Sequence, residues 1–126
     1  MSVNQFKGFD FIFVLKYNSI PSLNELYDIF NILQEKTADL PIFYLIADVL
    51  AFREKPSREI REYVKKRLNF LKNLIYVTYI TDIPEIFSIV PQFVLSTTNI
   101  KEFSVSIDYE DALKKILEFQ KLNKLF

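Results

Sequence analysis

Residues 42–49 read IFYLIADV, an apolar stretch whose single charged residue is Asp48. A stretch this rich in β-branched and aromatic residues, with no alternation of polar side chains, predicts a strand that is buried on both faces. Strands of this kind occur in parallel sheets covered by helices. The fold class therefore depends on whether helical segments precede and follow this stretch.

Three further stretches are predicted to be strands. Residues 9–17 read FDFIFVLKY and residues 74–81 read LIYVTYIT, and both are apolar enough to be buried. Residues 101–107 read KEFSVSI and alternate between polar and apolar side chains. This alternation predicts a strand at the edge of the sheet, or one with a half-covered face.

Amphipathic segments separate the predicted strands. Ser22 and Glu25 have the spacing of a capping box, which predicts a helix that ends before Pro41. Ser57 is the predicted N-cap of a second helix, which extends to about residue 73. Asp108 is the predicted N-cap of the last helix.

A third helical stretch is predicted to begin at Asp82 and to break at Pro91. Strand and helix then alternate in the order βαβαβαβα over one domain, residues 1–126. We expect an α/β domain with a four-stranded, mostly parallel sheet, right-handed crossovers and helices packed on it.

The composition excludes several kinds of chemistry. The chain has no His and no Cys, which removes the Ser-His-Asp triad, thiol nucleophiles and the usual zinc ligands. One Gly, Gly8, cannot build a Gly-rich phosphate loop. We therefore expect no cofactor and a non-enzymatic function, while oxygen-ligated Mg²⁺ or Ca²⁺ stays open.

Charge and hydropathy bear on the partners and the location. Lys plus Arg and Asp plus Glu both number 16, so no global basic field attracts nucleic acid. The N-terminus lacks the features of a signal peptide, and no apolar run approaches the ~20 residues of a membrane span. We expect a cytoplasmic protein without a transmembrane segment.

Asp48 is the most prominent candidate site residue, because it ends an otherwise apolar strand. Binding sites of open α/β sheets lie beyond the carboxyl ends of the strands, where this side chain is expected. The carboxylate could bind a metal, a hydroxyl or a loop. Alternatively it accepts amide hydrogen bonds in the following turn, which is the interpretation that we favour.

The second predicted helix and the loop before it carry a local excess of positive charge. Residues 53–72 hold eight cations and three anions. Arg58, Arg61 and Lys65 fall on one helical stripe, which could meet an acidic protein surface, with Phe52 as an exposed apolar contact. The alternative is a solvated helix face with ordinary i,i+4 ion pairs. A homodimer also stays open.

Two segments resemble a known family. Residues 45–49, LIADV, and residues 101–113, KEFSVSIDYEDAL, resemble the STAS-like domains of sporulation anti-sigma-factor antagonists. The resemblance covers about residues 9–120 and implies a non-enzymatic regulatory or protein-interaction module. It also implies a phosphorylated serine at the helix after the Asp-ended strand, near Ser57. The family's Asp-Ser-Ser-Gly loop reads EKPSR here, without Gly.

An alternative function follows from the same resemblance, because STAS-like domains share a fold class with SEC14-like lipid-binding modules. The chain would then bind a small molecule or lipid within its aromatic interior, which 13 Phe and 7 Tyr could line. A cavity above about 300 Å³ would favour this alternative.

Overall fold

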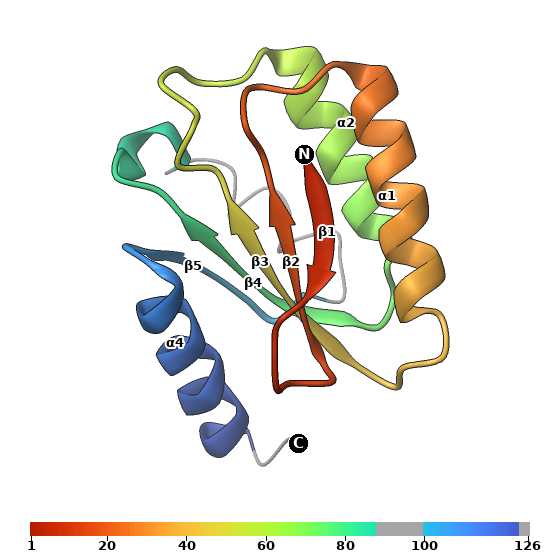
Figure 1. The fold of residues 1–126 in the computed structure, drawn as a ribbon, viewed down its shortest axis with the longest axis vertical. Coiled ribbons are helices and arrows are strands. Elements are labelled where there is room, and N and C mark those ends of the chain that lie inside the picture. The colour runs from red at the N-terminus through yellow and green to blue at the C-terminus, as the bar shows by residue number, and fades with distance from the viewer. Residues whose placement is uncertain (88–99, 124–126) are drawn as a thin grey trace.

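A five-stranded sheet runs through the centre of the molecule (Figure 1). The computed structural model describes residues 1–87 and 100–123. The strands are β1 (Ser2–Gln5), β2 (Ile12–Lys16), β3 (Phe43–Asp48), β4 (Leu74–Ile80) and β5 (Glu102–Ser106). They are ordered β1-β2-β3-β4-β5 in the sheet, with β1 antiparallel to β2 and all other pairs parallel. The α/β fold and the four predicted strands are confirmed, and β5 lies at an edge as expected.

The predicted count of four strands is wrong, because β1 adds a fifth and makes the sheet mixed. This strand buries one side chain, Val3, so its sequence has no apolar run that would reveal it. The first predicted strand also began too early, since residues 9–11 belong to the turn between β1 and β2. In that turn Gly8 has a φ of 88°, a conformation that L side chains rarely adopt.

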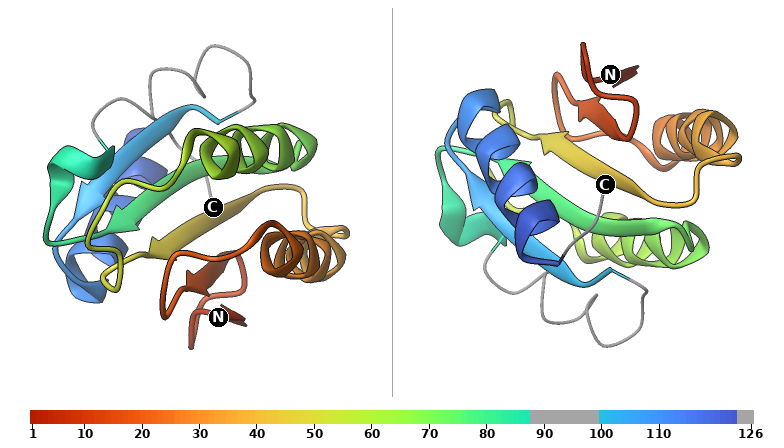
Figure 2. Two further views of the ribbon diagram at one scale, coloured as in Figure 1. Left: turned by 90° about the horizontal axis from the view of Figure 1, so that it is seen from above. Right: turned by 90° about the horizontal axis from the view of Figure 1, so that it is seen from below.

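Helices cover both faces of the sheet. The described helices are α1 (Leu23–Thr37), α2 (Arg58–Phe70), the short 3₁₀ helix η1 (Pro84–Phe87) and α4 (Tyr109–Leu122). Right-handed crossovers between strands taken in sequence place α1 and α2 on one face. Figure 2 shows these two helices side by side, with α4 on the opposite face. The break predicted at Pro91 lies outside the described residues.

The predicted caps form at all three α-helices. At α1 the Ser22 hydroxyl accepts from the Glu25 amide at 3.2 Å, and the Glu25 carboxylate accepts from the Ser22 amide at 3.0 Å. These bonds hold the pKa of Glu25 below its usual value. At α4 the Asp108 carboxylate accepts from the Asp111 amide at 2.8 Å. These local signals decide where the helices begin.

Each face of the sheet has its own hydrophobic core. On the α1/α2 face, side chains of both helices, such as Leu33 and Leu68, pack on alternate strand residues such as Leu45 and Val77. On the α4 face, Ile116 packs against the strand residues that point the other way. Among the described helices, none combines the length and the apolar character that crossing a membrane requires.

Candidate functional site

Asp48 connects two elements at the carboxyl edge of the sheet. Its residue is 3% exposed at the end of β3. One carboxylate oxygen accepts from the Leu50 amide at 3.2 Å, and the other accepts from the Tyr109 hydroxyl at 2.5 Å. The first bond confirms the favoured interpretation, in which Asp48 stabilises the turn that follows its strand. The second fastens β3 to the first residue of α4.

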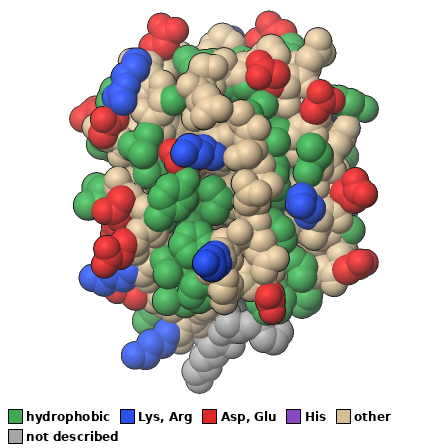
Figure 3. Space-filling model, in the orientation of Figure 1, with side chains coloured by type: hydrophobic (Ala, Val, Ile, Leu, Met, Phe, Trp, Pro, Cys, Tyr) green, Lys and Arg blue, Asp and Glu red, His purple; other side chains and the backbone are tan. Residues whose placement is uncertain are grey.

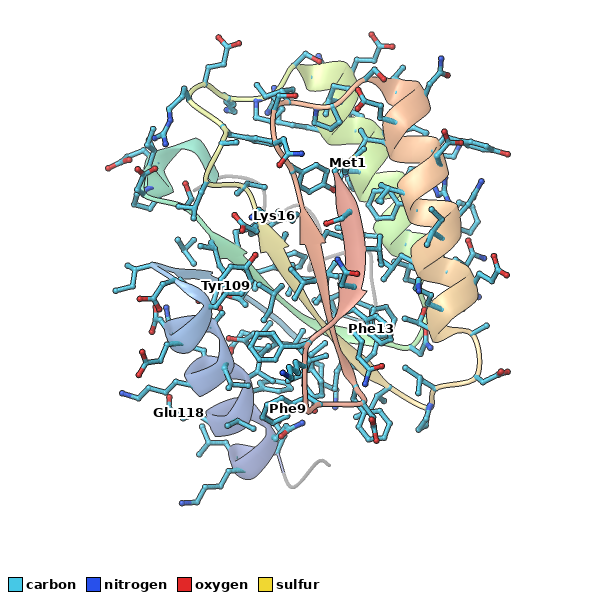
Figure 4. All side chains as sticks on the ribbon, in the orientation of Figure 1. Met1, Phe9, Phe13, Lys16, Tyr109 and Glu118 are labelled. Carbon is cyan, nitrogen blue, oxygen red and sulfur yellow. The ribbon has the colours of Figure 1, made fainter. Side chains whose placement is uncertain are left out.

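Within the described part of the chain, the surroundings of Asp48 do not form a metal centre. Among residues 1–87 and 100–123, no three His, Cys, Asp or Glu side chains gather where they could hold an ion. Lys16 is the β2 neighbour of Asp48, and Figure 4 labels both Lys16 and Tyr109. Burial raises the pKa of Tyr109, and its bond to Asp48 raises it further. The Tyr109 hydroxyl therefore stays protonated and donates to the carboxylate over the ordinary pH range.

Ser57 lies at the same edge, at the start of α2. Its hydroxyl accepts from the Ile60 amide at 3.2 Å, as the sequence predicts for an N-cap, and the residue is exposed. The side chain is therefore both part of the helix end and open to solvent. An added phosphate would sit at the positive end of the helix dipole.

The three cations of the predicted stripe have different surroundings. Arg58 is exposed, whereas Arg61 and Lys65 are half-buried. The Arg61 Nε donates to the Pro56 carbonyl at 3.2 Å, so this side chain folds back over the loop that precedes α2. Lys65 also interacts with neighbours, so only Arg58 extends plainly into solvent.

The prediction that Phe52 is an exposed docking contact is wrong. The residue is 5% exposed, and its ring lies 5.6 Å from that of Tyr17, centroid to centroid. A bend after β3 turns this side chain into the α1/α2 core. The loop surface next to it instead presents an ion pair between Arg53 and Asp82, with 3.0 Å between nitrogen and oxygen.

Sequence reasoning missed the role of Arg67, which it counted only as one of the cations of the helix. Its guanidinium lies 5.4 Å from the centre of the Phe30 ring and donates to the Asn31 side chain at 2.7 Å. It also donates to the Tyr63 hydroxyl at 2.9 Å. Arg67 therefore fastens α2 to α1. The spacing of Tyr63 and Arg67, four residues apart in a helix, was the available signal.

Two hollows bear on the ligand-binding alternative. A cavity of about 70 Å³ lies between α2 and the sheet and is lined almost entirely by apolar side chains. A groove of about 520 Å³ between β5 and α4 is open, and charged residues such as Lys101 and Glu118 line it. The first is too small for a lipid chain, and the second is not an apolar pocket.

Comparison of the chain with models of protein families, with curated proteins and with solved structures finds no match.

Proposed function

We propose that the protein is a non-enzymatic regulatory module of STAS-like type, which binds a partner protein through the N-terminal half of α2 and the loop before it. The observation that carries the proposal is the position of Ser57. An exposed hydroxyl caps α2 at the carboxyl edge of the parallel sheet, in the crossover that follows the Asp-ended strand β3. This position lies near the one where the STAS-like resemblance implies a regulatory serine.

The surface around Ser57 suits an acidic partner. Arg58 is exposed beside it, and Arg61 lies one turn further along the helix. A basic helix end of this kind accelerates encounter with an acidic surface and weakens with added salt. Modification of Ser57 would change the charge at this position by about two units, and a docked partner would sense that change.

The sheet order supports the same proposal. Strands β2 to β5 lie in sequence order, so the loops after β2, β3 and β4 all emerge along one edge. The loop after β3 leads to Ser57, and the loop after β4 contributes Asp82, which is paired to Arg53. The partner would therefore meet a surface built from two neighbouring crossovers.

The test is a triple charge reversal, Arg58→Glu with Arg61→Glu and Lys65→Glu, in affinity capture from native lysate with identification of the captured protein by mass spectrometry. The matched control reverses three exposed lysines elsewhere, Lys36, Lys114 and Lys121, with the same change in net charge. We expect capture of one defined partner to fall about tenfold or more in the first variant only.

Circular dichroism establishes that both variants are folded. Retention of every specific partner by a folded Arg58/Arg61/Lys65 variant would mean that this helix face is merely solvated. Equal losses in the two triple variants would mean that net charge, rather than this surface, governs capture.

A further inference from the structure

The cavity beneath α2 combines apolar walls with three side chains that carry polar groups. It lies between α2, α1 and the carboxyl halves of β2, β3 and β4, within the layer that Figure 2 shows on one side of the sheet. Its walls include Ala47 and Val77 from the strands and Val64 from α2. The polar groups among its lining residues come from Tyr17, Tyr79 and Arg61.

Tyr17 is the first unusual feature of this cavity. The residue is 7% exposed, and no described residue forms a hydrogen bond with its hydroxyl. The fully buried side-chain oxygens that lack a partner among the described residues belong to Tyr44 and Asn69, so the Tyr17 hydroxyl retains some solvent access. Burial raises the pKa of Tyr17, and the nearby Tyr79 raises it further, so the hydroxyl is a protonated donor.

Arg61 supplies a positive charge at the rim. Its Nε is fixed by the Pro56 carbonyl at 3.2 Å, which orients the guanidinium over the loop. Among the described residues, none accepts from its two terminal amino groups. A half-buried, oriented guanidinium with two free donors favours a carboxylate, because the two shapes match.

The size of the cavity limits the ligand. Its volume is about 70 Å³. An engineered cavity of about 150 Å³ binds benzene, so this one has room for about three or four carbon atoms. Its walls are apolar, so the enclosed part of a ligand must be a short hydrocarbon chain.

We propose that this cavity binds a small apolar monocarboxylate, whose short or branched chain lies against Ala47 and Val77. The carboxylate binds Arg61 at the rim and accepts from the Tyr17 hydroxyl. This site shares Arg61 with the proposed partner surface but does not rest on that proposal, because binding of the monocarboxylate is measured without any partner. A lipid chain is excluded by the volume, and a bare anion would leave the apolar walls unused.

The test is a titration with isovalerate, followed by amide chemical shifts in two-dimensional NMR. Acetate, which has almost no apolar chain, and isoamyl alcohol, which lacks the charge, serve as comparison probes. We expect saturable shifts at the lining residues, with a dissociation constant in the millimolar range. Both comparison probes should bind about tenfold more weakly.

Three variants locate the site. Tyr17→Phe keeps the ring and should weaken isovalerate binding about fivefold or more, and Arg61→Gln about tenfold or more. Lys66→Gln removes an exposed charge from the same helix and should change nothing. Ala47→Leu fills the cavity and should abolish binding while the chain stays folded by circular dichroism.

Absence of saturable shifts with isovalerate would overturn the proposal. So would binding that Tyr17→Phe and Arg61→Gln leave unchanged, or isoamyl alcohol that binds as tightly as the acid. If Ala47→Leu is not folded, the Tyr17 and Arg61 variants decide the matter alone.

Discussion

The two faces of the sheet are stabilised in different ways. Among the described residues, the α1/α2 face buries 19 hydrophobic residues in its core, and the α4 face buries nine. The α4 face includes polar pairs next to its core, such as Asp48 with Tyr109 and the hydroxyls of Thr78 and Ser106, which lie 2.6 Å apart. The α1/α2 face is instead apolar and encloses the cavity that Tyr17 lines.

Half-buried aromatic side chains are a further feature of the α4 face. Phe6, Phe9 and Tyr109 lie together on the α4 side, with ring centroids 5.7 and 6.3 Å apart, and they are partly exposed. Figure 3 shows hydrophobic side chains gathered on the viewed side of the molecule. The comparison teaches that side-chain hydrogen bonds add to the apolar contacts that position α4 on the sheet, whereas α1 and α2 pack on the sheet through apolar contacts and are joined to each other by Arg67. The bonds of Asp48 to the Leu50 amide and the Tyr109 hydroxyl give it a structural role, and the proposed partner surface lies instead at the exposed end of α2.

The largest expected loss of stability comes from truncating a buried side chain in either core. Leu33→Ala on the α1/α2 face should lower the free energy of unfolding by about 2–5 kcal/mol, because two helices enclose the site and cannot close the space. Ile116→Ala on the α4 face should lie at the low end of that range, since a single helix can shift to fill the space. Urea unfolding measures both. An equal or larger loss for Ile116→Ala would break the contrast between the faces.

The fold was predictable wherever one segment carries its own signal. Seven apolar residues around Asp48 predict the strand β3, and the spacing of Ser22 and Glu25 predicts the start of α1. Strand β1 could not be found this way, because an edge strand with one buried residue has no apolar run. Its position depends on pairing with β2 across the Gly8 turn, which is a tertiary effect.

The site was less predictable than the fold, because its geometry joins distant segments. That Ser57 caps α2 follows from the sequence, since a cap is local. That Tyr109 would donate to Asp48, 61 residues away, does not. The burial of Phe52 likewise depends on the bend after β3, and apolar character alone cannot distinguish a docking residue from a core residue.

The polar link between β3 and α4 should contribute the next largest effect. Tyr109→Phe removes the donor and leaves the Asp48 carboxylate buried with one amide partner. We expect a loss of about 1.5–3 kcal/mol in the free energy of unfolding, the range for hydrogen bonds to charged groups. Tyr27→Phe, at a residue that is 57% exposed, is the matched control and should change little. If neither variant changes the free energy of unfolding, the position of α4 does not depend on this bond.

Alkaline pH tests the apolar face. Burial holds the pKa values of Tyr17 and Tyr79 above their ordinary value of 10.0. Below pH 10 both phenols are protonated in the folded and unfolded states, so their contribution to the free energy of unfolding does not change with pH. Above pH 10 the unfolded chain loses these protons first, and unfolding becomes easier by up to about 1.4 kcal/mol per phenol for each pH unit.

Urea unfolding at increasing pH measures this slope. Tyr17→Phe and Tyr79→Phe should each flatten it, because a phenylalanine has no proton to lose. A slope that both variants leave unchanged would mean that the two hydroxyls are not buried as described.

The smallest expected effect is at the helix cap. Ser57→Ala removes the acceptor for the Ile60 amide and should cost about 1 kcal/mol of stability. Ser57→Asp restores an acceptor and should recover most of the loss. Thermal or urea unfolding of the pair distinguishes them. Equal stability of Ser57→Ala and the unchanged protein would show that the hydroxyl is free for partners and contributes nothing to the helix.

The most direct test of the proposed partner surface on α2 is site-specific photocrosslinking in native lysate. A photoreactive phenylalanine replaces Arg58 beside Ser57 or, as the matched position on the other face, Lys114 on α4; both residues are exposed. We expect position 58 to yield one dominant adduct with another protein, competed by the unlabelled chain, and position 114 to yield none. A specific adduct at position 114 with none at position 58 would move the function to the α4 face and overturn the assignment.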